Sequence, residues 1–174
     1  MQNSDDHFIQ LRDSRKLCFA QYGDPEGFVV VNAHGGLACR RDVAAADAGA
    51  RAAGVRLISP DRPGVGRSDP HSGRTLLDWV DDVSQLLDQL GVERCAAMGW
   101  SMGGQYAAAL GMALPPRVTR VAIIAGAVPL TEVAVFEQLP AMDRVFTRLS
   151  QRIPAIARLC FAAMGLTARA FPER

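Results

Sequence analysis

Extended apolar runs alternate with helical patterns along most of this 174-residue chain. The clearest run is 28–33, FVVVNA, whose continuous apolar character is typical of a strand buried on both faces of a sheet. Further strand-like runs lie at 55–59, 94–99 and 120–126, and the stretches with helical character between the runs are 42–53, 75–90 and 102–114. Strands that alternate with helices predict an α/β fold, with a mostly parallel sheet and flanking helices.

The segment that starts at Thr75 has the clearest helical period. Thr75 is a suitable N-cap, and Gly91 is a suitable stop. The apolar residues spaced for one helix face are Leu76, Leu77, Val80, Val83, Leu87 and Leu90. We therefore expect a helix here with these six side chains on its apolar face.

The two ends of the chain differ from this alternating region. Residues 8–11 and 16–22 are typical of two short strands joined by a turn, which predicts a hairpin. From residue 130 onward no further strand is evident. The amphipathic helices expected there are 133–139, 142–153 and 155–164, broken by Pro140 and Pro154.

Glycine-rich segments follow three of the expected strands: HGG at 34–36, PDRPGVGRSDP at 60–70 and GWSMG at 99–103. The carboxyl ends of parallel strands meet at one edge of a sheet, so we expect the functional site there. Ser101 lies between two glycines at the corner between a strand and a helix, the arrangement called a nucleophile elbow. The G-x-S-x-G pattern alone arises by chance in roughly one chain in twenty of this length, so its context carries the argument.

These three motifs, in this order and after these strands, resemble those of the α/β-hydrolase fold family. His34-Gly35-Gly36 resembles the family's H-G-x oxyanion loop, 61–68 resembles its D-x-R/P-G-x-G-x-S loop, and 99–103 resembles its nucleophile elbow. The resemblance covers about residues 8–128 and implies that the chain corresponds to the N-terminal portion of such a fold. It implies a partial hydrolase core at 1–128, followed at 129–174 by the start of a helical cap or lid.

The resemblance also implies a chemistry: a cofactor-free serine hydrolase that acts on carboxylic esters or thioesters through an acyl-enzyme. Ser101 would be the nucleophile, and the backbone N–H groups of Met102 and Gly36 would form the oxyanion hole. The loops that support these groups contain His34, Gly35, Gly99, Gly103 and Asp61. A serine at the elbow separates the chain from epoxide hydrolases and haloalkane dehalogenases, which resemble it elsewhere but place an aspartate there.

The base and the acid that a serine nucleophile needs are not identifiable in the sequence. The family places both after the serine, whereas His7, His34 and His71 all precede Ser101. His34 belongs to the oxyanion loop, His71 is interpreted as a solvated loop residue, and His7 lies in a tail expected to fray. The acids that follow the sixth expected strand are interpreted as charges on cap helices: Glu132, Glu137 and Asp143.

The 174-residue chain alone is therefore expected to be inactive or very weak. Two alternatives stay open at this point. One is a truncated or degenerate, non-catalytic α/β-hydrolase-like protein. The other is a base supplied in trans by a second chain.

Charge and cysteine content argue against several other classes of function. A formal net charge of +1 gives no reason to expect nucleic acid as a partner. The four cysteines form no C-x-x-C pair, so no metal or redox motif is predicted. The polar start at 1–7 and the lack of ~18 uninterrupted apolar residues predict a cytoplasmic protein without a membrane span. The expected partner is a small-molecule acyl substrate, and self-association is expected through exposed apolar surface at the sheet edge after the sixth expected strand. The apolar stripe at 155–164 is interpreted as cap packing, with an exposed apolar face as the alternative.

Overall fold

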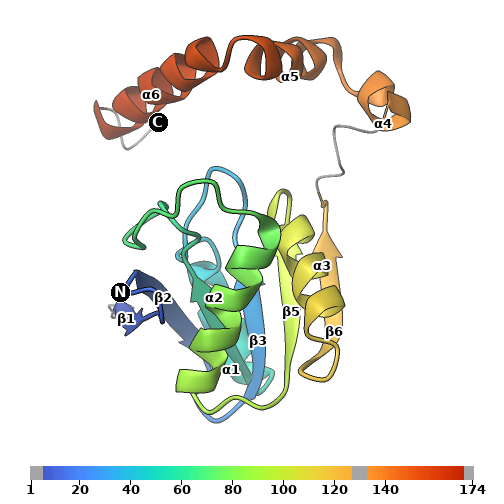
Figure 1. Ribbon diagram of the computed structural model, residues 1–174. Helices are drawn as coiled ribbons and strands as arrows, with labels where there is room; N and C mark the ends of the chain where they lie inside the picture. Colours follow the sequence, from blue (N-terminus) through green and yellow to red (C-terminus); the bar gives the residue numbers. More distant parts are fainter. Residues whose placement is uncertain (1–5, 127–132, 171–174) are drawn as a thin grey trace. The chain divides into compact units, whose positions relative to one another are not determined.

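Two compact units make up the chain, Met1–Ala127 and Val128–Arg174. The computed structural model describes residues 6–126 and 133–170 (Figure 1). In these residues the first unit is a sheet with flanking helices, and the second unit is helical.

A six-stranded sheet forms the centre of the first unit, in the order β1-β2-β4-β3-β5-β6. Its strands are β1 (His7–Gln10), β2 (Lys16–Gly23), β3 (Phe28–Ala33), β4 (Val55–Pro60), β5 (Cys95–Trp100) and β6 (Val118–Ile124). Strands β4, β3, β5 and β6 run parallel to one another, whereas β2 is antiparallel to both β1 and β4. The α/β fold is thus confirmed, and the antiparallel hairpin at one edge makes the sheet mixed.

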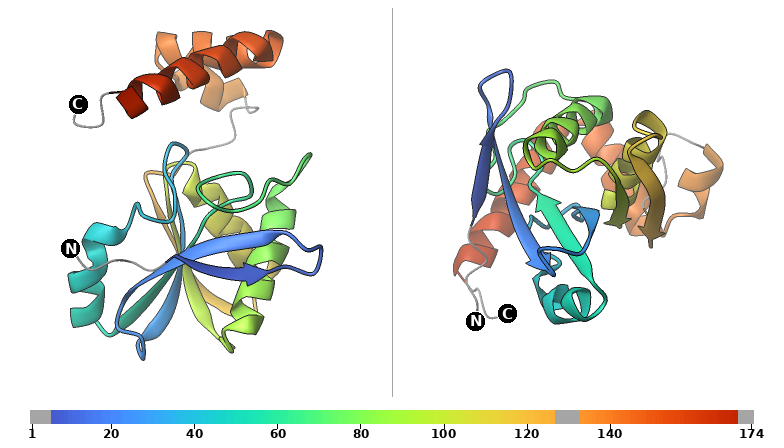
Figure 2. Two further views of the ribbon diagram at one scale, coloured as in Figure 1. Left: turned by 90° about the vertical axis from the view of Figure 1, so that its left-hand side faces the viewer. Right: turned by 90° about the horizontal axis from the view of Figure 1, so that it is seen from below.

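Helices cover both faces of this sheet. The short helix α1 (Asp47–Ala52) lies on one face, while α2 (Leu76–Gln89) and α3 (Gly103–Ala113) lie on the other (Figure 2). The larger core fills the face under α2 and α3, and Trp79 and Leu110 are fully buried there. Burial of this apolar surface is the main force that holds the sheet and the helices together.

The buried face of α2 is rotated about the helix axis relative to the face predicted from the sequence. Val80, Val83 and Leu87 are buried as expected, but Leu77 is 64% exposed. The buried stripe runs through Trp79, Val83 and Leu86, and Leu77 lies on the opposite side of that stripe at 100° per residue. The predicted cap is present: Thr75 accepts a hydrogen bond from the Asp78 N–H, and Asp78 accepts one from the Thr75 N–H.

The segment 42–53 is helical only in its second half, so the prediction of one helix there was wrong in its first half. Residues 42–43 form a turn, Ala44–Ala46 form the 3₁₀ helix η1, and α1 begins at Asp47. The Asp42 side chain accepts hydrogen bonds from three groups outside any helix. These contacts tie the start of the segment to the preceding loop and to β5.

His7 belongs to β1 and not to a frayed tail, which corrects the expectation for this residue. It pairs with Phe19 across the hairpin, and the two ring centroids are 5.2 Å apart. Strand pairing and the ring contact hold this residue in the hairpin.

The described part of the second unit contains three helices: α4 (Val133–Gln138), α5 (Ala141–Arg152) and α6 (Pro154–Ala170). Pro140 is the N-cap of α5 and Pro154 is the first residue of α6, positions where a missing N–H costs no helical hydrogen bond. Helix α6 extends further at its C-terminal end than the predicted 155–164, and it contacts α5. Among the described residues, no helix has the length and apolarity that crossing a membrane requires.

Candidate active site

Ser101 has a left-handed backbone conformation at the junction between β5 and α3. Its φ is +52°, a value that non-glycine residues adopt only where the surrounding structure holds them. The Ser101 N–H donates to the Ile124 carbonyl at 3.0 Å, and the Ser101 carbonyl accepts from the Gly104 N–H at 3.0 Å. Both neighbours, β6 and the first turn of α3, therefore hold the serine in this conformation.

The two glycines that flank Ser101 are required by close backbone packing. A Cβ atom at Gly99 would overlap the carbonyl of Gly103, and a Cβ atom at Gly103 would overlap the carbonyl of Ala33. The turn at residues 99–103, called the elbow below, is thus packed directly on the end of β3. This spacing explains why the sequence needs small residues on both sides of the serine.

Gly36 and Met102 are neighbours in space although they lie on different loops. A Cβ atom at Gly36 would be 3.2 Å from Met102 Cε and 3.6 Å from Met102 Cβ. Among the described residues, neither the Gly36 N–H nor the Met102 N–H donates a hydrogen bond. Two unpaired N–H groups therefore lie on adjacent segments beside Ser101.

His34 is buried, and both of its ring nitrogens are used by the protein. Its Nδ1 donates to the Gly35 carbonyl at 2.9 Å, and its Nε2 accepts from the Arg62 N–H at 3.2 Å, which assigns the Nδ1–H tautomer. Burial, and secondly the nearby Arg62 guanidinium, hold the pKa of His34 below its usual value. His34 is therefore a neutral structural residue and is not available to take a proton from Ser101.

Arg62 binds the 34–36 loop through two backbone carbonyls. Its two terminal nitrogens donate to the carbonyls of His34 at 2.6 Å and Gly35 at 2.7 Å, and its guanidinium lies 4.8 Å from the ring centroid of Tyr106. The carbonyl and the N–H of one trans peptide point in opposite directions. By fixing the Gly35 carbonyl, Arg62 therefore also fixes the direction of the Gly36 N–H.

Asp61 is a buried structural ion-pair partner. Its carboxylate accepts from the Arg40 N–H and side chain, both at 2.7 Å, and from the Arg67 N–H at 3.1 Å. Arg40 also pairs with Asp6, and hydrogen bonds from Arg40 and Arg67 hold the pKa of the Asp6 carboxyl well below its usual range. The local hydrogen bonds expected of the Asp61 loop are present, but Arg40 is a partner that the sequence did not indicate.

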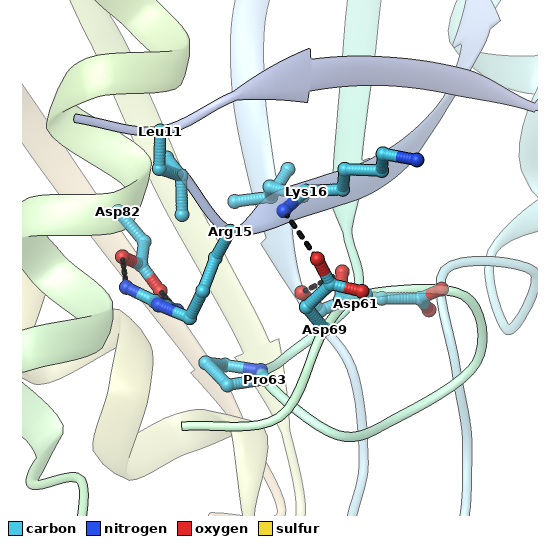
Figure 3. A pocket seen from close by; sticks show the side chains of 9 residues that line it. Leu11, Arg15, Lys16, Asp61, Pro63, Asp69 and Asp82 are labelled. Atoms are coloured by element: carbon cyan, nitrogen blue, oxygen red, sulfur yellow. Dashed lines mark hydrogen bonds and ion pairs between the residues drawn. The ribbon is translucent and has the colours of Figure 1, made fainter. Parts of the chain in front are cut away.

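The hollow in Figure 3 lies apart from the elbow. It is lined by Leu11, Arg15, Lys16, Leu17, Asp61, Pro63, Ser68, Asp69 and Asp82. Two of its charged groups pair with each other, because Arg15 donates to both carboxylate oxygens of Asp82 at 2.9 and 2.6 Å. None of Ser101, Met102 and Gly36 lines this hollow, so it is not the place where an acyl group would meet the serine.

No histidine in the described part of the chain is hydrogen-bonded to Ser101. His7 lies in β1, His34 is used as described above, and His71 has a buried Nδ1 that lacks a partner among the described residues. The acids that follow the sixth strand in the sequence are not placed beside Ser101 by any described contact. Glu137 lies in α4 and Asp143 lies in the first turn of α5, while Glu132 lies outside the described residues.

The chain is similar in sequence to known proteins. The family model described as alpha/beta hydrolase fold matches residues 29–169. The proline iminopeptidase of Xylella fastidiosa is 31% identical over 124 residues, which cover 68% of this chain and 39% of the relative. A 2-hydroxy-6-oxononadienedioate/2-hydroxy-6-oxononatrienedioate hydrolase of Pseudomonas putida is 40% identical over 78 residues, or 43% of this chain and 27% of that protein. The chain thus spans well under half of the length of these relatives.

Solved structures show the same fold. A hypothetical protein of Pseudomonas aeruginosa PAO1 is 32% identical, with a TM-score of 0.63 over 71% of this chain and 44% of that chain. A thioesterase domain from the curacin biosynthetic pathway has a TM-score of 0.65 at 23% identity and covers 86% of this chain and 62% of its own. The second likeness shows the fold alone.

Proposed function

Because the chain belongs to the α/β hydrolase fold family, we propose that it provides the nucleophile of a cofactor-free serine hydrolase that acts on carboxylic esters or thioesters. The observation that carries this proposal is the φ of +52° at Ser101, between β5 and α3. A strained backbone at this point turns the hydroxyl out of the sheet, where it can attack an acyl carbon. That attack forms a tetrahedral intermediate, which expels the alcohol or thiol with the serine's proton and leaves an acyl-enzyme on Ser101 Oγ for water to hydrolyse.

The N–H groups of Gly36 and Met102 are the proposed oxyanion hole. The support is that both are unpaired among the described residues and that their segments are in contact. A tetrahedral intermediate places negative charge on the former carbonyl oxygen, and preformed donors stabilise it without reorganisation. Removal of one such donor typically slows the reaction about 100- to 1,000-fold.

The proposed substrate class follows from the chemistry of the nucleophile. Esters and thioesters have better leaving groups than amides, so they demand least from a serine. The similar proteins include one named as a hydrolase of Pseudomonas putida and, by fold, a thioesterase domain. This likeness supports acyl transfer to water as the reaction type.

A second candidate is a non-catalytic α/β-hydrolase-like protein. It is favoured by one observation: within the described residues, no histidine is paired with Ser101. A serine without its base loses around a million-fold in kcat in a related mechanism, with about 1,000-fold over water left from binding and the oxyanion hole. For that reason we expect the 174-residue chain by itself to turn over very slowly or not at all.

A fluorophosphonate probe tests the first candidate against the second. We expect the probe to label Ser101 slowly, because no histidine of the described residues is paired with it, and we expect the Ser101→Ala variant to lose all labelling. Ser72→Ala is the matched control, because Ser72 is exposed and makes no hydrogen bond in the described part of the chain. Labelling that persists in Ser101→Ala would reject Ser101 as the nucleophile. Rapid, Ser101-dependent hydrolysis of a p-nitrophenyl ester by the 174-residue chain would reject the non-catalytic alternative.

A further inference from the structure

We infer that Asp42 is a positioning residue that holds the 34–36 loop against the elbow, an inference that rests on the proposed function for its catalytic meaning. Asp42 lies in the turn before η1, and its side chain is half-buried. Its Oδ2 accepts from the indole Nε1–H of Trp100 at 2.6 Å and from the Gly35 N–H at 3.2 Å, and its Oδ1 accepts from Asn32 Nδ2 at 2.8 Å. One carboxylate thus bonds to the elbow, to the loop and to the end of β3.

Trp100 completes this connection by direct packing. A Cβ atom at Gly35 would lie 2.7 Å from Trp100 Cζ2 and 2.9 Å from Trp100 Cε2, so the indole rests on the Gly35 backbone. The short bond to Asp42 fixes the plane of this indole, because an N–H group that donates to a carboxylate makes a strong, directional hydrogen bond. Trp100 is 42% exposed, so packing alone does not hold the ring in place.

Gly35 is held from two sides. Arg62 donates to its carbonyl and Asp42 accepts from its N–H. The Arg62 contacts reach the 34–36 loop and the ring of Tyr106, whereas the Asp42 contacts also reach the residue before Ser101. Gly36 follows Gly35 directly, and Met102 lies two residues after Trp100. Because Asp42 is bonded to both Gly35 and Trp100, it is the group that connects the Gly36 N–H to the Met102 N–H.

The distance between two oxyanion donors matters because both must reach one oxygen atom. A misplacement of about 1 Å can cost about 100-fold in rate. Asp42 makes no hydrogen bond to Ser101 in the described structure. Its effect on the reaction must therefore act through Trp100 and Gly35.

Indole signals in ¹H–¹⁵N spectra of the 174-residue chain test this arrangement without any need for activity. The chain has two tryptophans: the Trp100 Nε1–H is bonded to Asp42, while the Trp79 Nε1–H is buried without a partner among the described residues. We expect Asp42→Ala to move the Trp100 indole signal upfield, to speed its exchange with solvent at least about tenfold, and to shift the Gly36 and Met102 amides. The Trp79 indole signal should stay in place. The control Asp81→Asn removes an exposed carboxylate on α2 and should move none of these signals.

The rate of Ser101 labelling by the fluorophosphonate probe is the second measurement. We expect Asp42→Ala to lower the second-order rate constant about 10- to 100-fold. Asp42→Asn keeps one acceptor oxygen and should recover part of the loss. Trp100→Phe should cause a similar loss, and the double variant Asp42→Ala/Trp100→Phe should be no slower than the slower single variant, because both remove the same hydrogen bond.

The two measurements separate the failure of this inference from the failure of the proposed function. Labelling at the original rate in Asp42→Ala, or unshifted Gly36 and Met102 amides, overturns the positioning role. If the unsubstituted chain never labels at Ser101, the proposed function fails, and the amide shifts alone decide whether Asp42 connects the loop to the elbow. Should Asp42→Ala fail to fold, Asp42→Asn provides the same two readouts, and Trp100→Phe, which has no indole at position 100, still provides the Gly36 and Met102 amide shifts and the labelling rate.

Discussion

Close backbone contacts limit which side chains fit at the two positions that flank the elbow serine, Gly99 and Gly103. The elbow is so close to β3 that a methyl group at Gly103 would overlap the Ala33 carbonyl. Overpacking against backbone cannot be relieved by a rotamer change, so it is more costly than the same volume added beside a flexible side chain. The serine itself keeps a left-handed φ because its own N–H and carbonyl are bonded to β6 and α3.

Gly103→Ala should therefore lower the free energy of unfolding by about 3 kcal/mol or more, and it should abolish labelling of Ser101. Gly49→Ala is the matched control, because a Cβ atom at Gly49 in α1 meets nothing within 4 Å. That control should stabilise the chain by about 0.5–1 kcal/mol, since alanine favours a helix. Urea unfolding measures both variants. Equal stability of the two variants would contradict the close packing of the elbow.

Asp6 is the residue whose titration should contribute to acid unfolding. Arg40, Arg67 and Arg41 hold the pKa of Asp6 well below its unfolded value of about 3.9. A carboxyl with a depressed folded-state pKa stabilises the fold at neutral pH, and this stabilisation is lost as the pH falls below about 4. Asp6→Asn should lower the free energy of unfolding by roughly 1 kcal/mol or more at pH 7.

The difference between Asp6→Asn and the unsubstituted chain should shrink as the pH falls from 5 toward 2. Glu26→Gln serves as the control, because Glu26 is exposed in the turn before β3. Denaturant unfolding at several pH values measures the effect. A difference that stays constant from pH 5 to pH 2 would show that Asp6 does not titrate with folding.

At the scale of elements, α2 shows how local and tertiary signals combine. Its start is local, since the Thr75 and Asp78 side chains each accept from the backbone N–H of the other. Its buried face is tertiary, because Trp79 and Leu86 face the sheet while Leu77 does not. Leu76 and Leu77, at the start of the helix, satisfy the helical period, but both are exposed and lie outside the buried stripe.

Thr75→Ala should lower the free energy of unfolding by about 1 kcal/mol through loss of this cap. Ser72→Ala, an exposed change three residues earlier, should have no measurable effect. The double variant Thr75→Ala/Asp78→Ala should lose less than the sum of the two single losses, because the two residues form one capping box. Additive losses in thermal unfolding would argue against the reciprocal cap.

At the scale of the whole molecule, strand β6 leaves apolar surface exposed. It is one of the two edge strands of the described sheet, and the exposed fractions of Val121, Ile123 and Ile124 are 41%, 54% and 52%. An apolar edge strand can pair with another chain, and natural sheets often block such edges with lysine. This feature belongs to the sheet as a whole, because it depends on which strands lie beside β6.

Ala122→Lys should therefore reduce self-association of the 174-residue chain. We expect the unsubstituted chain to elute as oligomers in size-exclusion chromatography with light scattering, and the variant to shift toward the monomer. Ser72→Lys adds the same charge in an exposed loop and should leave the distribution unchanged. A monodisperse monomer of the unsubstituted chain would contradict the prediction.

Most of the architecture could be read from residue patterns. The run 28–33 became β3 with the same bounds, and the other strands and the later helices shifted by a few residues at their ends. Periodicity and glycine positions encode these elements because they depend on near neighbours in the chain. The family resemblance followed from the order of three short motifs, and the family match over 29–169 bears it out.

The partners of the site residues could not be read in this way. Three such pairs are Arg62 with the 34–36 loop, Arg40 with Asp61, and Asp42 with Trp100, and their members lie 21 to 58 positions apart in the chain. No local pattern in the sequence marks such pairs, because the packing of β3, β4 and β5 brings them together. The sequence by itself therefore determined the elements, their order and the place of Ser101. Only the tertiary structure decided which charged and aromatic side chains hold that serine's loops, since hydrogen bonds form between groups that the fold places within about 3 Å of each other.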